Sequence, residues 1–312
     1  LQNKPEITGR KAEKTICSEP MFKLLATDID GTILAHDGSL PDQNRVGLKR
    51  LHAAGVTIVF ASGRADIGIK QLSPRIITPD DNDYLIAYNG ARIVTADTRR
   101  PVFEKLLSSD AVAAVVAYCR AHGLYVQAYD ADDFVVEAEN DDTLSYSEAV
   151  EMTYRVVEDL ITAVPRTPKL LVIGEHELLT EHLPQLQALG GSGSGAAPAL
   201  APAPNDRGRS PAGQTSAFQV AFSKPRYLEI VAAGVDKGTA LVSLANRLGV
   251  PIDQTIALGD SGNDVPLLVA AGTGVAVGDA RDEAKTSADE ILESGADGGI
   301  MDEVIARFFP NL

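Results

Sequence analysis

Two acidic residues stand one residue apart, directly after an apolar run near the start of the chain. The segment KLLATDIDGT, residues 23–32, places Asp28 and Asp30 where a buried strand is expected to end. Acidic residues are poor strand formers, and two carboxylates this close repel each other. Stability alone does not explain the pair, which indicates chemistry that needs two carboxylates in one place.

Other polar residues occupy similar positions later in the chain. Ser62 ends the apolar run VTIVFAS, Asn89 follows DYLIAY, and Asp260 follows TIALG. Lys237 opens the helical pattern DKGTALVSLANRLG. Ligands of parallel sheets that are flanked by helices bind at the carboxyl ends of the strands. These side chains are therefore expected to share one cleft.

Carboxylates dominate that expected cleft: Asp28, Asp30, Asp260 and Asp264. They would repel one another strongly unless a cation lies among them. Oxygen ligands of this kind favour Mg²⁺, which keeps several waters and uses few carboxylates together with a substrate phosphate. With a lysine and a small hydroxyl donor nearby, the reaction that this group suits is phosphoryl transfer, in which positioning and charge neutralisation dominate.

The paired acids can divide the work of such a reaction. An ionised, metal-bound carboxylate can attack phosphorus as a nucleophile. The carboxyl two residues away can be held protonated, give its proton to the leaving oxygen, and later deprotonate water.

Four motifs in this order resemble the haloacid dehalogenase superfamily of phosphohydrolases. They are DIDGT, a serine after the second strand, a downstream lysine, and GDSGND. An insertion between the third strand and the lysine segment, together with NGA, LEIVAAGVDKGTAL and VAVGDA, resembles the Cof-type branch with a large α/β cap. The resemblance implies a Mg²⁺-dependent phosphatase of small phosphate monoesters, with sugar phosphates as the first substrate class.

The resemblance also implies roles for the matching residues. Asp28 would be the nucleophile that forms an aspartyl phosphate, and Asp30 would be the acid and base, its backbone carbonyl also touching Mg²⁺. Lys237 would neutralise charge on the nucleophile and the phosphate. Asp260 would ligate Mg²⁺ directly, and Asp264 would position Lys237 or a metal-bound water. The expected metal-binding set is thus Asp28, Asp30, Asp260 and Asp264.

Further residues are expected to contact the substrate: Ser62, Gly63, Arg64, Asn89 and Asn263. By the resemblance, Ser62 and the Gly63 amide would bind the transferring phosphoryl group, and Asn263 would contact phosphate. Alternatives stay open for several of these residues. Ser62 could cap the next helix, with or without a substrate contact, Arg64 could form a surface ion pair, and Asn263, like Asp264, could cap a helix. Asp279 stands where this branch usually has asparagine, which leaves the substrate contact of that loop open.

The order of apolar runs and helical patterns predicts an α/β fold. Residues 21–91 and 232–312 alternate strands and helices, which indicates a doubly wound parallel sheet, a Rossmann-like core. Residues 92–231 alternate polar and apolar positions, as half-exposed antiparallel strands do, and predict an inserted α+β cap domain. Residues 1–20 are expected to form a flexible extension, and the Gly-, Ala-, Pro- and Ser-rich residues 190–216 a flexible loop in the cap.

Composition limits the partners and the compartment. The net charge of −15 argues against nucleic acid or an anionic membrane, while a local cation still admits a small phosphorylated metabolite. Cys17 and Cys119 stand far apart, which indicates a reducing compartment without a disulfide scaffold or zinc site. No apolar run approaches the ~20 residues of a membrane span. A cytoplasmic location is expected, and an organellar one stays open if residues 1–20 are a targeting remnant.

Two rival functions use the same residues. A phosphomutase would form the same aspartyl phosphate and return the phosphoryl group to its substrate. A phosphate-sensing module would be phosphorylated on Asp28 without turnover, but it needs no leaving-group acid such as Asp30. No pattern in the sequence indicates an oligomeric state.

Overall fold

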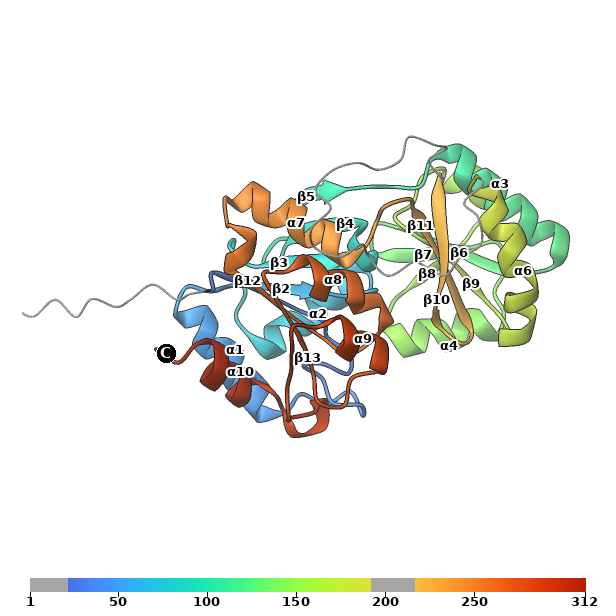
Figure 1. Cartoon of the computed structure of the whole chain (residues 1–312). Helices are drawn as coiled ribbons and strands as arrows, with labels where there is room; N and C mark the ends of the chain where they lie inside the picture. Colours follow the sequence, from blue (N-terminus) through green and yellow to red (C-terminus); the bar gives the residue numbers. More distant parts are fainter. Residues whose placement is uncertain (1–21, 192–216) are drawn as a thin grey trace, which may run out of the picture.

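A computed structural model describes residues 22–191 and 217–312 of the chain (Figure 1). The expectations for residues 1–20 and for all but the first two residues of 190–216 lie outside this described part. The described strands form two sheets, one of eight strands and one of six. No helix in residues 22–191 or 217–312 has the length and apolar character that crossing a bilayer requires.

The larger sheet is built mainly from buried parallel strands. In spatial order it contains β14 (Glu290–Ile291), β13 (Thr273–Ala276), β12 (Thr255–Gly259), β1 (Leu24–Thr27), β2 (Thr57–Ala61), β3 (Tyr84–Ala87), β4 (Arg92–Thr95) and β5 (Pro101–Glu104). The strands from β14 to β3 are parallel, and every residue of β1, β3 and β12 is buried. Continuous burial is typical of a parallel sheet that helices cover on both faces. The predicted α/β core is confirmed.

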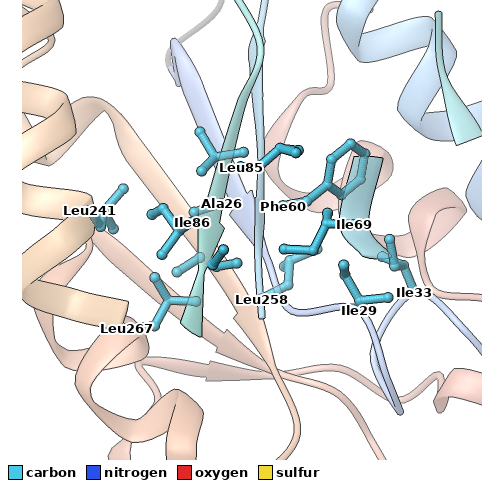
Figure 2. Close-up of a cluster of buried hydrophobic side chains, with 14 of the residues drawn as sticks. Ala26, Ile29, Ile33, Phe60, Ile69, Leu85, Ile86, Leu241, Leu258 and Leu267 are labelled. Atoms are coloured by element: carbon cyan, nitrogen blue, oxygen red, sulfur yellow. The ribbon is translucent and has the colours of Figure 1, made fainter. Parts of the chain in front are cut away.

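Helices cover both faces of this sheet. They are α1 (Asp42–Ala53), α2 (Asp66–Ile76), α7 (Lys237–Leu248), α8 (Val265–Ala270), α9 (Asp282–Ser287) and α10 (Met301–Phe308). Figure 2 shows Leu241 of α7 and Leu267 of α8 on one side of the strands and Ile69 of α2 on the other. All three side chains are fully buried. The two helical layers hold the carboxyl ends of the parallel strands together at one edge.

The last two strands of the larger sheet correct the expected domain boundary. The chain reverses after β3 in the short helix η1 (Tyr88–Gly90), where Tyr88 and Asn89 have φ angles of 52° and 54°. β4 then pairs antiparallel with β3, and β5 pairs with β4. Because both strands belong to the larger sheet, we infer that the insertion begins after Glu104 rather than at residue 92. Alternating polar and apolar residues predict a half-exposed hairpin, but they do not tell which sheet the hairpin extends.

The six-stranded sheet belongs to the insertion. In spatial order it contains β10 (Phe218–Lys224), β11 (Tyr227–Ala232), β9 (Leu170–Ile173), β6 (Tyr125–Asp130), β7 (Asp133–Val136) and β8 (Tyr154–Val156). Its helices are α3 (Ser109–His122), α4 (Asp141–Val150), α5 (Leu160–Ala163) and α6 (His176–Leu189). All pairs of strands are antiparallel except β7 with β8. We infer a core of residues 22–104 and 233–312 and a cap of residues 105–232, and we use these two names below.

The two faces of the cap sheet have different partners. Successive side chains of a strand point to opposite faces. In β9, Leu170 and Val172 join the apolar cluster that includes residues of α3 and α6, and these helices lie on the side away from the larger sheet (Figure 1). Leu171 and Ile173 instead join the same apolar cluster as the buried residues of the core. One face of the cap sheet is thus directed at the core.

Candidate active site

A buried lysine between two carboxylates lies at the strand-end edge of the core. The Nζ atom of Lys237 donates hydrogen bonds to Oδ1 of Asp28 and to Oδ1 of Asp264, at 2.6 Å each. Lys237 is 0% exposed and Asp28 is 5% exposed. Asp28 and Asp260 follow β1 and β12, which are neighbouring parallel strands, so the fold itself brings their carboxylates together.

Local packing fixes the lysine at the first position of α7. The Asp236 side chain accepts a hydrogen bond of 2.7 Å from the Thr239 amide and so caps the helix. A Cβ atom at Gly238 would lie 2.1 Å from the carbonyl oxygen of Pro266, so only glycine lets α7 approach α8 this closely. A cation at a helix N-terminus is unfavourable for the helix dipole. The carboxylates that receive the lysine compensate for this placement.

Asp264 supports both the lysine and the loop after β12. Its Oδ1 accepts from Lys237, while its Oδ2 accepts from the amides of Asp260 and Ser261, at 3.1 Å each. Both carboxylate oxygens are therefore engaged by the protein. This arrangement agrees with the expected role of Asp264 as the residue that positions Lys237.

The site carries more negative than positive charge. Burial and the nearby Asp264 raise the pKa of Asp28 well above its ordinary value, although Lys237 lowers it. Burial and Asp264 also raise the pKa of Asp260. Burial lowers the pKa of Lys237, but the two carboxylates raise it more, so the lysine stays charged. One lysine does not balance three carboxylates in a buried place.

The carboxylates fit a hard divalent cation. One oxygen each of Asp28, Asp260 and Asp264 lies within 4.8 Å of the others. Asp260 is held in place, because the Thr32 hydroxyl donates to its Oδ1 at 2.9 Å. Gly31 has a φ of 80°, and a Cβ atom there would lie 2.9 Å from Oδ2 of Asp260. Glycine at position 31 lets the backbone approach Asp260 closely. The three carboxylates thus offer closely spaced oxygen donors, which can hold a metal ion.

Asp30 lies at the rim of the site, apart from this trio. Its side chain is 52% exposed and accepts two hydrogen bonds from Arg64, at 2.8 Å from Nε and 2.6 Å from Nη2. Of the two alternatives for Arg64, the ion pair is the one that the structure contains. The Asp30 side chain is therefore not brought into the group of carboxylates that can share a metal ion.

Ser62 is buried at the end of β2 and does not cap the next helix. The N-terminal cap of α2 is Ala65, without a side-chain hydrogen bond, so that alternative is wrong. The Ser62 amide donates to the carbonyl oxygen of Ile86 at 2.8 Å, and its Oγ accepts from the Arg64 amide at 3.2 Å. The serine is thus fixed at the same strand-end edge as Asp28.

Asn89 and Asn263 meet across the site. Nδ2 of Asn263 donates to Oδ1 of Asn89 at 3.4 Å, and Nδ2 of Asn89 donates to Oε2 of Glu229 at 2.6 Å. A Cβ atom at Gly63 would lie 3.1 Å from Oδ1 of Asn89, so Gly63 also packs against this asparagine. The structure brings these three predicted substrate contacts together.

Asp279 has a structural contact. Its carboxylate accepts hydrogen bonds from the Ala296 amide, at 3.1 and 3.2 Å from its two oxygens. The residue therefore ties two core loops together. This contact does not indicate that the loop touches substrate, the point that the sequence left open.

Sequence reasoning missed two cap residues that reach the core. Lys169 stands directly before β9, and Glu229 stands within the apolar strand β11. Lys169 donates to Oε1 of Glu229 at 2.9 Å and to the carbonyl oxygen of Gly63 at 3.1 Å. The available signal was a charged residue inside the apolar run YLEIVAA, on the opposite face from the buried Leu228 and Ile230.

Comparisons with known proteins agree with this geometry. A family model described as haloacid dehalogenase-like hydrolase matches residues 25–304, which include every candidate residue named above. The HMP-PP phosphatase of Cronobacter sakazakii is 27% identical over 266 residues, covering 83% of this chain and 85% of that protein. The 5-amino-6-(5-phospho-D-ribitylamino)uracil phosphatase of Bacillus subtilis is 23% identical over 279 residues, covering 89% and 93%.

A solved structure matches the whole arrangement of core and cap. The crystal structure of a haloacid dehalogenase-like hydrolase from Bacteroides thetaiotaomicron superposes with a TM-score of 0.76 at 26% identity. It covers 92% of this chain and 100% of that chain. The resemblance drawn from the motifs is confirmed, and the chain belongs to the family of haloacid dehalogenase-like hydrolases.

Proposed function

We propose that this protein is a Mg²⁺-dependent phosphatase that hydrolyses small phosphate monoesters through an aspartyl phosphate on Asp28. The observation that carries the proposal is the buried Asp28 carboxylate, held by Lys237 beside Asp260 at the strand-end edge. The hydrogen bond from Lys237 orients this carboxylate, and the lysine charge compensates part of its negative charge. Phosphatases among the relatives support the same reaction class.

The metal site in this proposal consists of oxygen donors. Asp28 and Asp260, with the backbone carbonyl of Asp30, would hold Mg²⁺, and Asp264 completes the carboxylate cluster. When bound, Mg²⁺ would offset the negative charge of the carboxylates and of the phosphoryl oxygens. Asp264 acts chiefly through Lys237, because both of its oxygens accept hydrogen bonds from the protein.

The first half of the reaction transfers the phosphoryl group to the protein. A carboxylate oxygen of Asp28 attacks phosphorus, the bond from phosphorus to the ester oxygen breaks, and Asp30 gives its proton to the departing alcohol. Ser62 and the Gly63 amide bind the phosphoryl oxygens, and Lys237 offsets the charge that Asp28 and the phosphate share. Arg64 has to release the Asp30 side chain for this proton transfer.

The second half returns Asp28 to its starting state. Asp30 takes a proton from water, the water oxygen bonds to phosphorus, and the bond between phosphorus and Asp28 breaks. Inorganic phosphate leaves and the carboxylate is restored. The same residue thus acts as acid in the first half and as base in the second.

Small phosphorylated metabolites are the proposed substrates, with sugar phosphates as the first class to test. The net charge of −15 and the acidic site disfavour a nucleic acid partner. A cytoplasmic location is part of the proposal and accords with the use of only two cysteines.

A panel of phosphate esters tests the proposal. Phosphate release is measured with and without Mg²⁺ for the wild type, for Asp28→Asn, and for a matched control, Asp253→Asn, at an exposed position. We expect metal-dependent release that the control retains and that Asp28→Asn loses by several orders of magnitude, the scale on which removing a covalent nucleophile acts. Equal rates in all three proteins would refute the nucleophile. Isomer formation without free phosphate would instead identify a phosphomutase.

A further inference from the structure

A buried ion pair of the cap lies directly against the core. Lys169 and Glu229 are joined by a hydrogen bond of 2.9 Å, and their side chains are 3% and 12% exposed. Glu229 is paired with Leu171 in the cap sheet, so Lys169, two residues before Leu171, is its diagonal neighbour on the same face. That face is the one directed at the core. An ion pair in this place is desolvated, and its contacts with the core are therefore well defined.

Lys169 acts on the serine of the site through one peptide group. Its Nζ donates to the carbonyl oxygen of Gly63 at 3.1 Å. The amide of the same peptide belongs to Arg64 and donates to Oγ of Ser62 at 3.2 Å. Because Ser62 accepts this hydrogen bond, its own hydroxyl hydrogen remains available to donate to a phosphoryl oxygen. The lysine of the cap thus fixes the peptide that orients Ser62.

Glu229 acts on the second phosphate contact through an asparagine. Its Oε2 accepts from Nδ2 of Asn89 at 2.6 Å. This bond fixes the amide so that Oδ1 of Asn89 faces Nδ2 of Asn263, at 3.4 Å. Asn89 has a φ of 54°, a left-handed conformation that asparagine tolerates better than most residues. Glu229 therefore helps to orient Asn263, whose Oδ1 also accepts a hydrogen bond of 2.7 Å from the Ser261 hydroxyl.

The charges of Lys169 and Glu229 strengthen the hydrogen bonds that these residues make to Gly63 and Asn89 of the core. Burial lowers the pKa of Lys169, but Glu229 and Tyr146 raise it more, so the net pKa lies above the ordinary value and the lysine stays charged. Its ammonium also lies 5.2 Å from the centre of the Tyr129 ring. In a buried network, hydrogen bonds that share a peptide or an amide polarise one another. A charged donor at one end therefore strengthens the bond at the other end.

We propose that Lys169 and Glu229 are positioning residues for the phosphoryl-binding side chains Ser62 and Asn263, so that the docked cap completes the site of the core. The inference rests on the phosphatase function proposed above. Its specific content is that the pair acts on the phosphoryl group that all substrates share, and not on the leaving group. Its removal therefore affects every ester alike.

The test compares esters with small and large leaving groups. Lys169→Met, Glu229→Gln and the double variant are assayed with methyl phosphate, p-nitrophenyl phosphate and a hexose phosphate, together with inhibition by inorganic phosphate. We expect kcat/KM to fall about tenfold to a hundredfold in each single variant, the size of one lost hydrogen bond to a charged group, and by the same factor for each ester. Phosphate inhibition weakens in parallel, and Lys169→Arg restores part of the activity.

Two further variants separate positioning from folding. Leu170→Val changes the adjacent residue, whose side chain points to the other face of the sheet, so it should lower the unfolding midpoint and leave kcat/KM unchanged. Glu229→Gln keeps the shape of the side chain, so this variant still tests the inference if Lys169→Met does not fold. Non-additive losses in the double variant are expected, because both residues belong to one network.

Three results would overturn the inference. Losses confined to the hexose phosphate would make the pair a leaving-group contact. Losses in unfolding midpoint with unchanged kcat/KM would make it a structural ion pair. A wild type that releases phosphate from no ester would overturn the proposed function itself, a failure distinguishable from the other two because there the wild type is active.

Discussion

Replacing Lys237 by methionine removes the one buried cation of the carboxylate cluster. Its Nζ lies 2.6 Å from an oxygen of Asp28 and 2.6 Å from an oxygen of Asp264, and none of the residue is exposed. Methionine keeps the length of the side chain but offers neither a charge nor a donor. The variant leaves two buried carboxylates without their partner.

Breaking a buried ion pair on one side costs about 3–5 kcal/mol. This cost is a large share of the ~5–15 kcal/mol that stabilises a typical domain, so the variant should be measurably destabilised but still partly folded. Catalysis should suffer as well, because losing one preorganised group at a developing charge typically reduces kcat by about 10²–10³. Mg²⁺ should stabilise the variant more than it stabilises the wild type, since a bound cation replaces part of the missing charge.

The pH dependence of the destabilisation has a definite sign. The folded-state pKa of Asp28 is already raised above its unfolded value of 3.8, mainly by burial, so the contribution of Asp28 to stability is lost as the pH rises. Lys237 lowers that pKa. Without the lysine the pKa rises further, and the loss of stability with rising pH becomes steeper. The difference between variant and wild type should therefore be larger at about pH 8 than at about pH 5.

Urea unfolding of the wild type and Lys237→Met, in the presence of a chelator and at both pH values, measures this difference. Lys49→Met, at an exposed position of α1, is the matched control and should unfold like the wild type. Equal unfolding free energies at the higher pH, or a difference that shrinks as the pH rises, would refute the electrostatic account of the cluster.

Two further predictions concern Asp30 and a distant carboxylate. Asp30→Asn should lower kcat/KM far more for methyl phosphate than for p-nitrophenyl phosphate, because a good leaving group needs little acid assistance; equal losses would contradict the acid role. Glu303 accepts from the amides of Glu293 and Ser294, which, against the effect of burial, lower its pKa to about 2. Its contribution to stability is therefore present above its ordinary value of 4.5 and lost as the pH falls toward 2. In thermal unfolding, Glu303→Gln should have a lower midpoint than the wild type at neutral pH, and this difference should narrow in acid. A difference that stays constant with pH would contradict the stabilising role of the Glu303 carboxylate.

The carboxylate cluster was predictable because its geometry follows from local rules. Asp28 and Asp260 each follow a buried parallel strand, and parallel strands end at the same edge of a sheet. Lys237 opens a helix whose cap, Asp236, is visible in the sequence. These rules do not say which strands are neighbours, and the structure shows that β1 pairs with β12. The roles of these residues in catalysis remain predictions.

The contacts between cap and core were not predictable in this way. Lys169 meets Gly63 across 106 residues of sequence, and Asn89 meets Glu229 across 140. Alternation in β11 indicates that Glu229 lies on the opposite face from Leu228, but it does not tell what that face meets. The orientation of the cap is set by tertiary packing, which no short pattern encodes.

Hydrophobicity alone does not identify the buried face of α1. Val46 is apolar but 54% exposed. Asn44 is buried instead, because its side chain donates to the carbonyl oxygen of Ile33 and accepts from the amides of Ile300 and Met301. A polar residue that binds three backbone groups can take a core position that hydrophobicity alone does not assign to it.

Trapping the covalent intermediate tests the central claim most directly. The wild type is mixed with Mg²⁺ and a phosphate ester that the panel shows to be a substrate, quenched in acid during turnover, digested and analysed by mass spectrometry. The account predicts one added phosphoryl group on Asp28 in the peptide that contains KLLATDIDGT, absent from Asp28→Asn. A phosphoryl group on any other residue, or turnover with no phosphorylated peptide at any quench time, would contradict it.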